Sequence, residues 1–159
     1  MDLVCFDTQI IIWGIKKQAT PGQEGNIDKA RHLIQTCEKD GTEIMIPSVV
    51  VAEVLCALKP RLHIEFSAII HKRFIIPPFD TQAALKFAEI WQKRKAAKGD
   101  SKISRAEMKA DFMITATAVV GGAECIYSED AGLKKFAQDY INVRPLPSIA
   151  EQMTIEDAI

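Results

Sequence analysis

The sequence predicts a three-layer α/β/α sandwich around a central, mainly parallel sheet of five strands. Apolar runs of strand length alternate with stretches of helical periodicity, which is typical of a parallel sheet with helical crossovers. The chain of 159 residues has the length of one ordinary domain, and its hydrophobic fraction of 48% is that of a globular protein. We therefore expect a single domain over residues 1–159, with a core to about residue 145 and a short tail from 146 to 159.

Five short apolar runs are predicted as the strands of this sheet. A run that is apolar at nearly every position is typical of a parallel strand buried on both faces. Pro47 and Pro77 end two of the runs, because proline has no amide hydrogen to donate to a sheet. In chain order, the predicted strands are Leu3–Phe6, Glu43–Ile46, Phe74–Ile76, Glu124–Ser128 and Ile141–Val143.

Helices are predicted between these strands from apolar spacing and from residues that begin or end a helix. Behind Asn26, which can cap a helix, apolar residues recur at helical spacing: Ile27, Ala30, Ile34 and Cys37. Glycine and proline residues close most of the other helical stretches. The predicted helices are Thr8–Ile15, 27–40, Val49–Leu58, 61–73, 81–91, Lys109–Val120 and Ala131–Ala137.

Four acidic side chains are predicted to meet at the carboxyl edge of the sheet, where ligands bind in folds of this class. Asp7 directly follows the first strand, and Asp130 closely follows the fourth. Glu53 lies in the second turn of the helix Val49–Leu58, which is otherwise apolar, so its charge is costly without a partner. Asp111 is placed in the first turn of its predicted helix, where the positive helix end favours a carboxylate.

Taken one at a time, each acid has an ordinary explanation as a helix cap, a turn residue or a solvated helix position. Their joint placement is what indicates a site, because neighbouring carboxylates repel one another unless a cation lies among them. Oxygen ligands without histidine or cysteine at ligand spacing favour Mg²⁺ or Mn²⁺ over zinc. The predicted catalytic and metal-binding residues are Asp7, Glu53, Asp111 and Asp130.

Positive charge is concentrated in one stretch of an otherwise balanced chain. The formal net charge of −1 argues neither for nor against a nucleic-acid partner. Residues 93–109 nevertheless carry seven basic residues against two acidic ones. This stretch is either a solvated helix end and loop or a surface for RNA phosphates. The predicted RNA-binding residues are Lys93, Arg94, Lys95, Lys98, Lys102 and Arg105.

Cysteine spacing and the chain ends point to the cytoplasm. The four cysteines form no CxxC motif and lie in apolar stretches, so buried free thiols in a reducing compartment are expected. The amino end has Asp2 and no basic region typical of a signal peptide. No apolar run reaches the roughly 20 residues that would cross a membrane.

Four segments resemble the PIN-domain family, and they occur in the family's order. They are LVCFDT around Asp7, IPSVVVAEVL around Glu53, ADFMITATAVVGGAECIYSED spanning Asp111 to Asp130, and AGLKKFA directly after it. The third segment is the most specific of the four. The resemblance extends to about Val143, and within the family it is nearest to the toxin components of VapBC-type toxin–antitoxin pairs.

This resemblance implies a Mg²⁺- or Mn²⁺-dependent endoribonuclease that leaves 5′-phosphate and 3′-hydroxyl ends. It also implies a small antitoxin partner and a homodimer. The four acids match the family's acidic positions, and Thr8 and Ser128 match positions that often carry a hydroxyl near the site. Simple turn or capping hydrogen bonds explain those two hydroxyls equally well. Glu129 departs from the pattern, because it precedes Asp130 and can share or exchange its role.

Other functions are consistent with an acidic pocket at strand ends. A receiver domain would need paired acids after the first strand, where Thr8 follows Asp7, and a phosphoacceptor aspartate after the third strand, which ends in prolines. A haloacid-dehalogenase-type phosphatase would need a second aspartate where Gln9 stands. The serious rival is a catalytically silent or slow PIN scaffold that binds RNA or protein.

Overall fold

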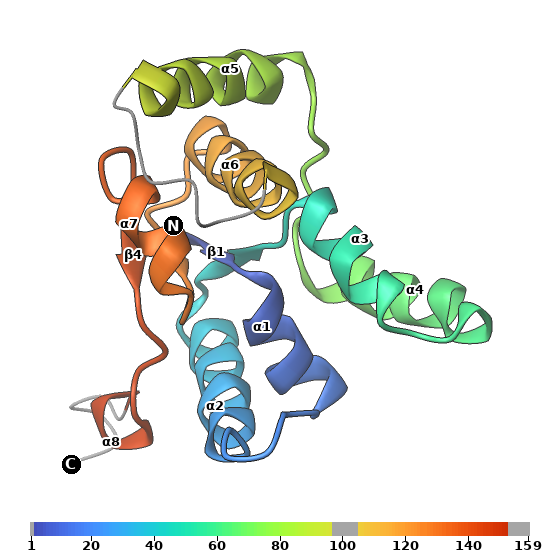
Figure 1. The fold of residues 1–159 in the computed structure, drawn as a ribbon. Helices are drawn as coiled ribbons and strands as arrows, with labels where there is room; N and C mark the ends of the chain where they lie inside the picture. The colour runs from blue at the N-terminus through green and yellow to red at the C-terminus, as the bar shows by residue number, and fades with distance from the viewer. Residues whose placement is uncertain (1, 97–104, 153–159) are drawn as a thin grey trace.

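The structure, a computed structural model, describes residues 2–96 and 105–152 as one parallel α/β unit (Figure 1). In Figure 1, α1 and α2 lie on one side of the sheet and α6 lies on the other, with α5 packed over α6. The strands are β1 Leu3–Phe6, β2 Glu43–Met45, β3 Cys125–Tyr127 and β4 Asn142–Arg144. The helices are α1 Thr8–Ile11, α2 Gly25–Asp40, α3 Ser48–Cys56, α4 His63–Arg73, α5 Thr81–Ala96, α6 Arg105–Val120, α7 Ala131–Ala137 and α8 Ile149–Gln152, with short turns at Ile12–Lys16 (π-helical, η1) and Pro60–Leu62 (3₁₀, η2).

The sheet has four strands in the order β2-β1-β3-β4, and all of them are parallel. This order makes β1 an interior strand, with Cys5 opposite both Met45 of β2 and Ile126 of β3. The prediction of a parallel α/β sheet is therefore confirmed. Because all strands run the same way, the residues that follow β1 and β3 lie at one edge.

The predicted strand at Phe74–Ile76 is the main correction to the fold. In the described part of the chain this segment contributes only an isolated parallel bridge between Met45 and Ile75. The Ile46 amide donates to the Ile75 carbonyl at 2.8 Å. Pro77 has no amide hydrogen for the next bond of that ladder, so the pairing stops after one bridge.

Two further predictions were wrong at the level of single residues. The helix predicted to begin at Lys109 begins at Arg105, so Asp111 lies beyond its first turn and gains little from the helix end. Cys56, expected to be buried, is exposed near the end of α3, while the other three cysteines are buried. Apolar neighbours in sequence did not predict its burial, because on a helix they face different directions.

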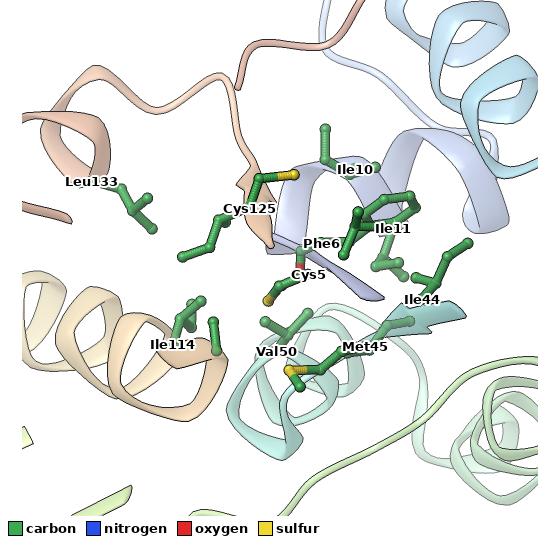
Figure 2. Packing of buried hydrophobic residues seen from close by; sticks show 14 of the residues in the cluster. Cys5, Phe6, Ile10, Ile11, Ile44, Met45, Val50, Ile114, Cys125 and Leu133 are labelled. Carbon is green, nitrogen blue, oxygen red and sulfur yellow. The ribbon is translucent and has the colours of Figure 1, made fainter. Parts of the chain in front are cut away.

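The core surrounds β1 on both faces. Phe6 of β1 is fully buried, as are Ile10 and Ile11 of α1 and Ile114 of α6. Figure 2 shows Ile10 and Ile11 on one side of the strand, and Ile114 with Val50 of α3 on the other. No helix in the described ranges has the length and apolar character needed to cross a membrane.

A chain of aromatic rings joins α5, α6 and α7. Phe112 of α6 is fully buried and lies edge-on to Phe136 of α7, with ring centroids 4.7 Å apart. Its ring also packs against Phe87 and Trp91 of α5, with ring centroids 6.3 and 5.6 Å away. Trp91 is therefore a packing residue, and Phe112 is the ring that all three helices share.

Truncating Phe112 is expected to destabilise the protein strongly. Phe112→Ala should lower the free energy of unfolding by about 3–5 kcal/mol, because it removes a buried ring and leaves a cavity between three helices. Leu85→Ala in α5 is the control, since Leu85 is 69% exposed. That change should stay within about 0.5 kcal/mol. Urea denaturation measures both, and similar losses in the two variants would contradict the proposed packing.

Candidate metal centre

Asp7 lies at the carboxyl end of β1 and caps α1. Its amide donates to the carbonyl of Tyr127 at the end of β3, at 3.1 Å, so the two strand ends are joined here. Its extended backbone, with φ −75° and ψ 165°, lets Oδ1 accept a 2.7 Å hydrogen bond from the Thr8 amide. The residue is only 6% exposed. The carboxylate is thus held in position and largely removed from water.

Ser128 connects Asp7 to the next acid. Its hydroxyl donates to Asp7 Oδ2 at 2.7 Å and accepts from the Asp130 amide at 3.0 Å. Ser128 is 5% exposed and directly follows β3. The two residues are 121 positions apart in the sequence, so only the parallel pairing of β1 and β3 brings them together.

Burial dominates the electrostatics of Asp7 and raises the pKa of its carboxyl group above the ordinary value. The hydrogen bonds from Ser128 and from the Thr8 amide act in the opposite direction and lower this pKa. The negative charge of Asp130 raises it further. A cation among these groups would favour the ionised form of Asp7.

Thr8 connects Asp7 to Glu53. The Thr8 hydroxyl donates to Glu53 Oε1 at 3.1 Å, across the packing of α1 against α3. Partial burial raises the pKa of the Glu53 carboxyl, the Thr8 hydrogen bond lowers it, and the charge of Asp7 raises it. Glu53 therefore belongs to the same electrostatic cluster as Asp7.

Asp130 caps α7 with one of its two carboxylate oxygens. Oδ1 accepts hydrogen bonds from the amides of Gly132 and Leu133, at 2.8 and 3.2 Å. The cap fixes the side chain relative to the helix and uses the same oxygen twice. Oδ2 takes no part in the cap and is the oxygen suited to a cation.

Glu129 has a different role from its neighbour. Its Oε1 accepts a 2.7 Å hydrogen bond from the Leu146 amide, which ties the segment after β4 to the end of β3. This bond gives Glu129 a structural function. A role for Glu129 shared or exchanged with Asp130 remains a prediction.

Asp111 lies on α6 and is half-buried. Helical spacing places it on one face with Thr115 and Ala118, which are both fully buried. Helix α6 packs against α3, α7 and β3, the elements that carry or adjoin the other site residues. The helix is therefore next to the site, and a metal-binding role for Asp111 remains a prediction.

The arrangement suits a hard cation but does not form a complete cage. Within residues 2–96 and 105–152, no three His, Cys, Asp or Glu side chains are grouped closely enough to hold a metal ion. Hydrogen bonds instead join Asp7 to Glu53 through Thr8, and to Asp130 through Ser128. All of these donors are oxygens, which fit Mg²⁺ or Mn²⁺. Closing a cage requires the acids to move toward a common ion.

Comparison with known families decides the classification. The family model described as the PIN domain matches residues 4–139. The chain belongs to the PIN-domain family. The matched range runs from β1 to just past α7 and contains all four predicted acids. No curated protein matches this PIN chain in sequence.

Solved structures with the same fold come from VapBC complexes. VapBC2 from Rickettsia felis, bound to a DNA fragment from their promoter, has a TM-score of 0.67 at 16% identity, covering 91% of this chain and 99% of that one. DNA-bound VapBC from Salmonella typhimurium has a TM-score of 0.64 at 18% identity, covering 92% and 100%. VapBC-1 from nontypeable Haemophilus influenzae has a TM-score of 0.62 at 14% identity, covering 91% and 98%. At these identities the likeness shows the shared PIN fold.

The predicted basic patch is only partly described. Lys98 and Lys102 lie outside the described residues, and Lys95 and Arg105 belong to the ends of α5 and α6. Lys93 lies 3.7 Å from Glu89 of the same helix and is 66% exposed. An RNA-binding role for this patch remains a prediction.

Sequence reasoning missed two residues on the neighbouring helix segment. Lys135 of α7 and Tyr140, just after it, line a cavity of about 300 Å³ together with Lys93 and Arg94. The available signal was the pair of lysines in AGLKKFA, close behind the acid Asp130. Only the packing of α5 and α7 against α6 reveals that these cations share one surface.

Because burial raises the pKa of Asp7, Asp7→Asn should stabilise the metal-free PIN domain at neutral pH. The folded state favours the neutral carboxyl, so that contribution is complete at low pH and is lost as pH rises through the raised pKa. The advantage of the asparagine should therefore vanish in acid. Chemical denaturation in EDTA at several pH values measures it, with Asp139→Asn, at an exposed position, expected to change stability by less than about 0.5 kcal/mol. A less stable Asp7→Asn variant at pH 7 would show that the ionised carboxylate stabilises the fold.

Proposed function

We propose that this PIN domain is a metal-dependent endoribonuclease of the cytoplasm, acting as the toxin of a VapBC-type toxin–antitoxin pair. The observation that carries the proposal is the Asp7 network around a buried carboxylate. The Ser128 hydroxyl joins this carboxylate to the Asp130 amide, and Thr8 joins it to Glu53 through its amide and its hydroxyl. Such a group is costly without a cation and useful with one. The fold shared with VapBC complexes supports the toxin assignment.

The four acids would hold one or two Mg²⁺ or Mn²⁺ ions. Asp7, Asp111 and Asp130 are proposed as direct ligands, with Glu53 binding directly or through water. The metal would supply a water of lowered pKa and neutralise charge on the phosphate. The chain's own contribution is orientation, because Ser128 and the Thr8 amide each hold one oxygen of Asp7.

A protein partner is part of this proposal. The helix pair α3–α4 extends from the body of the molecule in Figure 1, and Ile64 on α4 is 86% exposed. A cavity of about 350 Å³ lies between η1 and α4, lined in part by Leu58, Phe66 and Ile69. Exposed apolar surface of this kind is typical of an interaction site. An antitoxin or the second subunit of a homodimer would cover it.

A silent scaffold is the second candidate. The observation in its favour is that the acids of the described chain do not form a ready metal cage. The observation against it is that Asp7 is buried and lies in a hydrogen-bond network with two further acidic residues, which a scaffold does not need. Cleavage assays separate the two.

Purified protein should cut RNA in Mn²⁺ or Mg²⁺ and not in EDTA. Asp7→Asn should reduce the cleavage rate at least about 100-fold, because losing even a residue that only orients a ligand costs about 10–100-fold. Asp40→Asn is the matched control and should retain activity, since Asp40 precedes β2 at the opposite edge of the sheet. Equal cleavage rates with and without metal, or equal rates in the wild type and Asp7→Asn, would reject the proposal of a metal-dependent nuclease.

Ser128 tests the positioning of Asp7. Ser128→Ala should weaken Mn²⁺ binding by about 10–100-fold, because Asp7 Oδ2 and the Asp130 amide both lose their partner. Calorimetric titration measures this affinity. Ser67→Ala on α4 is the control and should bind Mn²⁺ as the wild type does. Unchanged Mn²⁺ affinity in Ser128→Ala would show that the Ser128 hydroxyl does not position Asp7 for metal binding.

The toxin assignment predicts a small antitoxin encoded beside this protein. Its co-expression should suppress RNA cleavage and growth arrest, because it would cover the acidic site. Sequencing the RNA fragments left after brief expression would identify the substrate. A long, unrelated neighbouring gene would weaken the toxin assignment and leave the nuclease proposal intact.

A further inference from the structure

A cavity between α5, α6 and α7 is lined in part by basic side chains, in contrast to the acidic site. Its volume is about 300 Å³. The lining residues are Ile90, Lys93, Arg94, Phe112, Lys135, Phe136, Asp139 and Tyr140. Among the described residues, the lining therefore contains three cations and one carboxylate above aromatic and aliphatic side chains.

We propose that this cavity binds a backbone phosphate of single-stranded RNA, a few nucleotides from the bond that is cut. Lys93 and Arg94 would contact the phosphate from α5, and Lys135 from α7. The inference rests on the proposed nuclease function. It adds the path that the RNA takes away from the metal centre.

The position of α7 supports this path. Asp130 caps the start of the helix at the metal centre, and Lys135 lies five residues further along. At 1.5 Å per residue this is about 7.5 Å along the helix axis. A strand whose scissile phosphate lies at Asp130 can therefore reach the cavity within a few nucleotides. An anionic active site needs such cations nearby to hold a polyanion.

Lys93 is already directed over the cavity wall. Its Nζ lies 5.6 Å from the centroid of the Tyr140 ring, and Glu89 is its only ion-pair partner among the described residues, at 3.7 Å. Below it, Phe112 and Phe136 are buried and packed edge to face, which makes the floor rigid. The planar guanidinium of Arg94 suits a phosphate, which it can contact through two N–H groups. An acidic side chain of a protein would bring a single negative charge to this cavity, whereas an RNA strand brings a series of phosphates.

Adjacent lysines in α7 provide a matched test. Lys135 lines the cavity and Lys134 does not, although both are exposed and belong to the same helix turn. The probe is a fluorescein-labelled oligouridylate of about 12 nucleotides, within the site sizes of single-strand binders. The protein carries Asp7→Asn so that the RNA stays intact, and affinity is followed by fluorescence anisotropy at several salt concentrations.

Lys135→Ala should weaken RNA binding roughly 3- to 10-fold and lower the slope of log affinity against log salt by about 0.7, the value for one phosphate contact on a single strand. Lys134→Ala should change affinity less than about 2-fold and leave the slope unchanged. Removing all three cations should lower the slope by about 2. Asp139→Asn should tighten binding, because it removes the one carboxylate in the lining.

Equal effects of Lys134→Ala and Lys135→Ala would show diffuse attraction and overturn the cavity assignment, as would weaker binding by Asp139→Asn. Normal RNA binding by the triple variant, with lost binding to polyglutamate, would make the cavity a site for an acidic protein segment and also overturn it. These outcomes are separate from failure of the nuclease. If the wild type cuts RNA but Lys134→Ala and Lys135→Ala have equal effects on binding, only the cavity proposal is rejected. If the protein binds RNA through Lys135 but does not cut it, only the nuclease proposal is rejected.

Discussion

The hydrogen bond from Ser128 to Asp7, 2.7 Å long, is the interaction on which the site depends. It joins the ends of two neighbouring parallel strands and holds a carboxylate that is nearly inaccessible to water. The same hydroxyl accepts a hydrogen bond from the Asp130 amide, and the hydroxyl of Thr8, the residue after Asp7, donates a hydrogen bond to Glu53. Three acidic residues are thus tied to one sheet edge by two small hydroxyl side chains.

The surrounding fold holds this acidic network in place. Strand β1 is paired on both sides and packed on both faces, so the backbone that carries Asp7 has little freedom. Burial is the main cause that raises the pKa of the Asp7 and Glu53 carboxyl groups, and neighbouring acids raise it further. A cation among these carboxylates would favour their ionised forms, and this supports the proposed metal site.

Sequence alone predicted the parallel sheet and the positions of four strands, because buried strands have local signals. It also placed Asp7, Glu53 and Asp130 near one another, and hydrogen bonds through Thr8 and Ser128 connect these three residues, while the place of Asp111 in the site remains a prediction. It did not predict that the expected strand at Phe74–Ile76 forms only one bridge, between Ile75 and Met45. That outcome depends on where Pro77 falls relative to the pairing segment, which the local sequence does not show. The start of α6 was missed, because polar residues near Arg105 have no helical periodicity. The bond from the Leu146 amide to Glu129, and the cavity at Lys135, arise from tertiary packing and have no local signal.

In the proposed metal centre, Asp7, Asp111 and Asp130 would converge on a divalent cation, with Glu53 beside them. Crystals grown with Mn²⁺ and measured at the manganese absorption edge test this most directly. We expect an anomalous peak at the carboxyl ends of β1 and β3, at coordination distance from Asp7 and at least one other of these acids. An anomalous map without a peak there, from protein saturated with Mn²⁺, would contradict it.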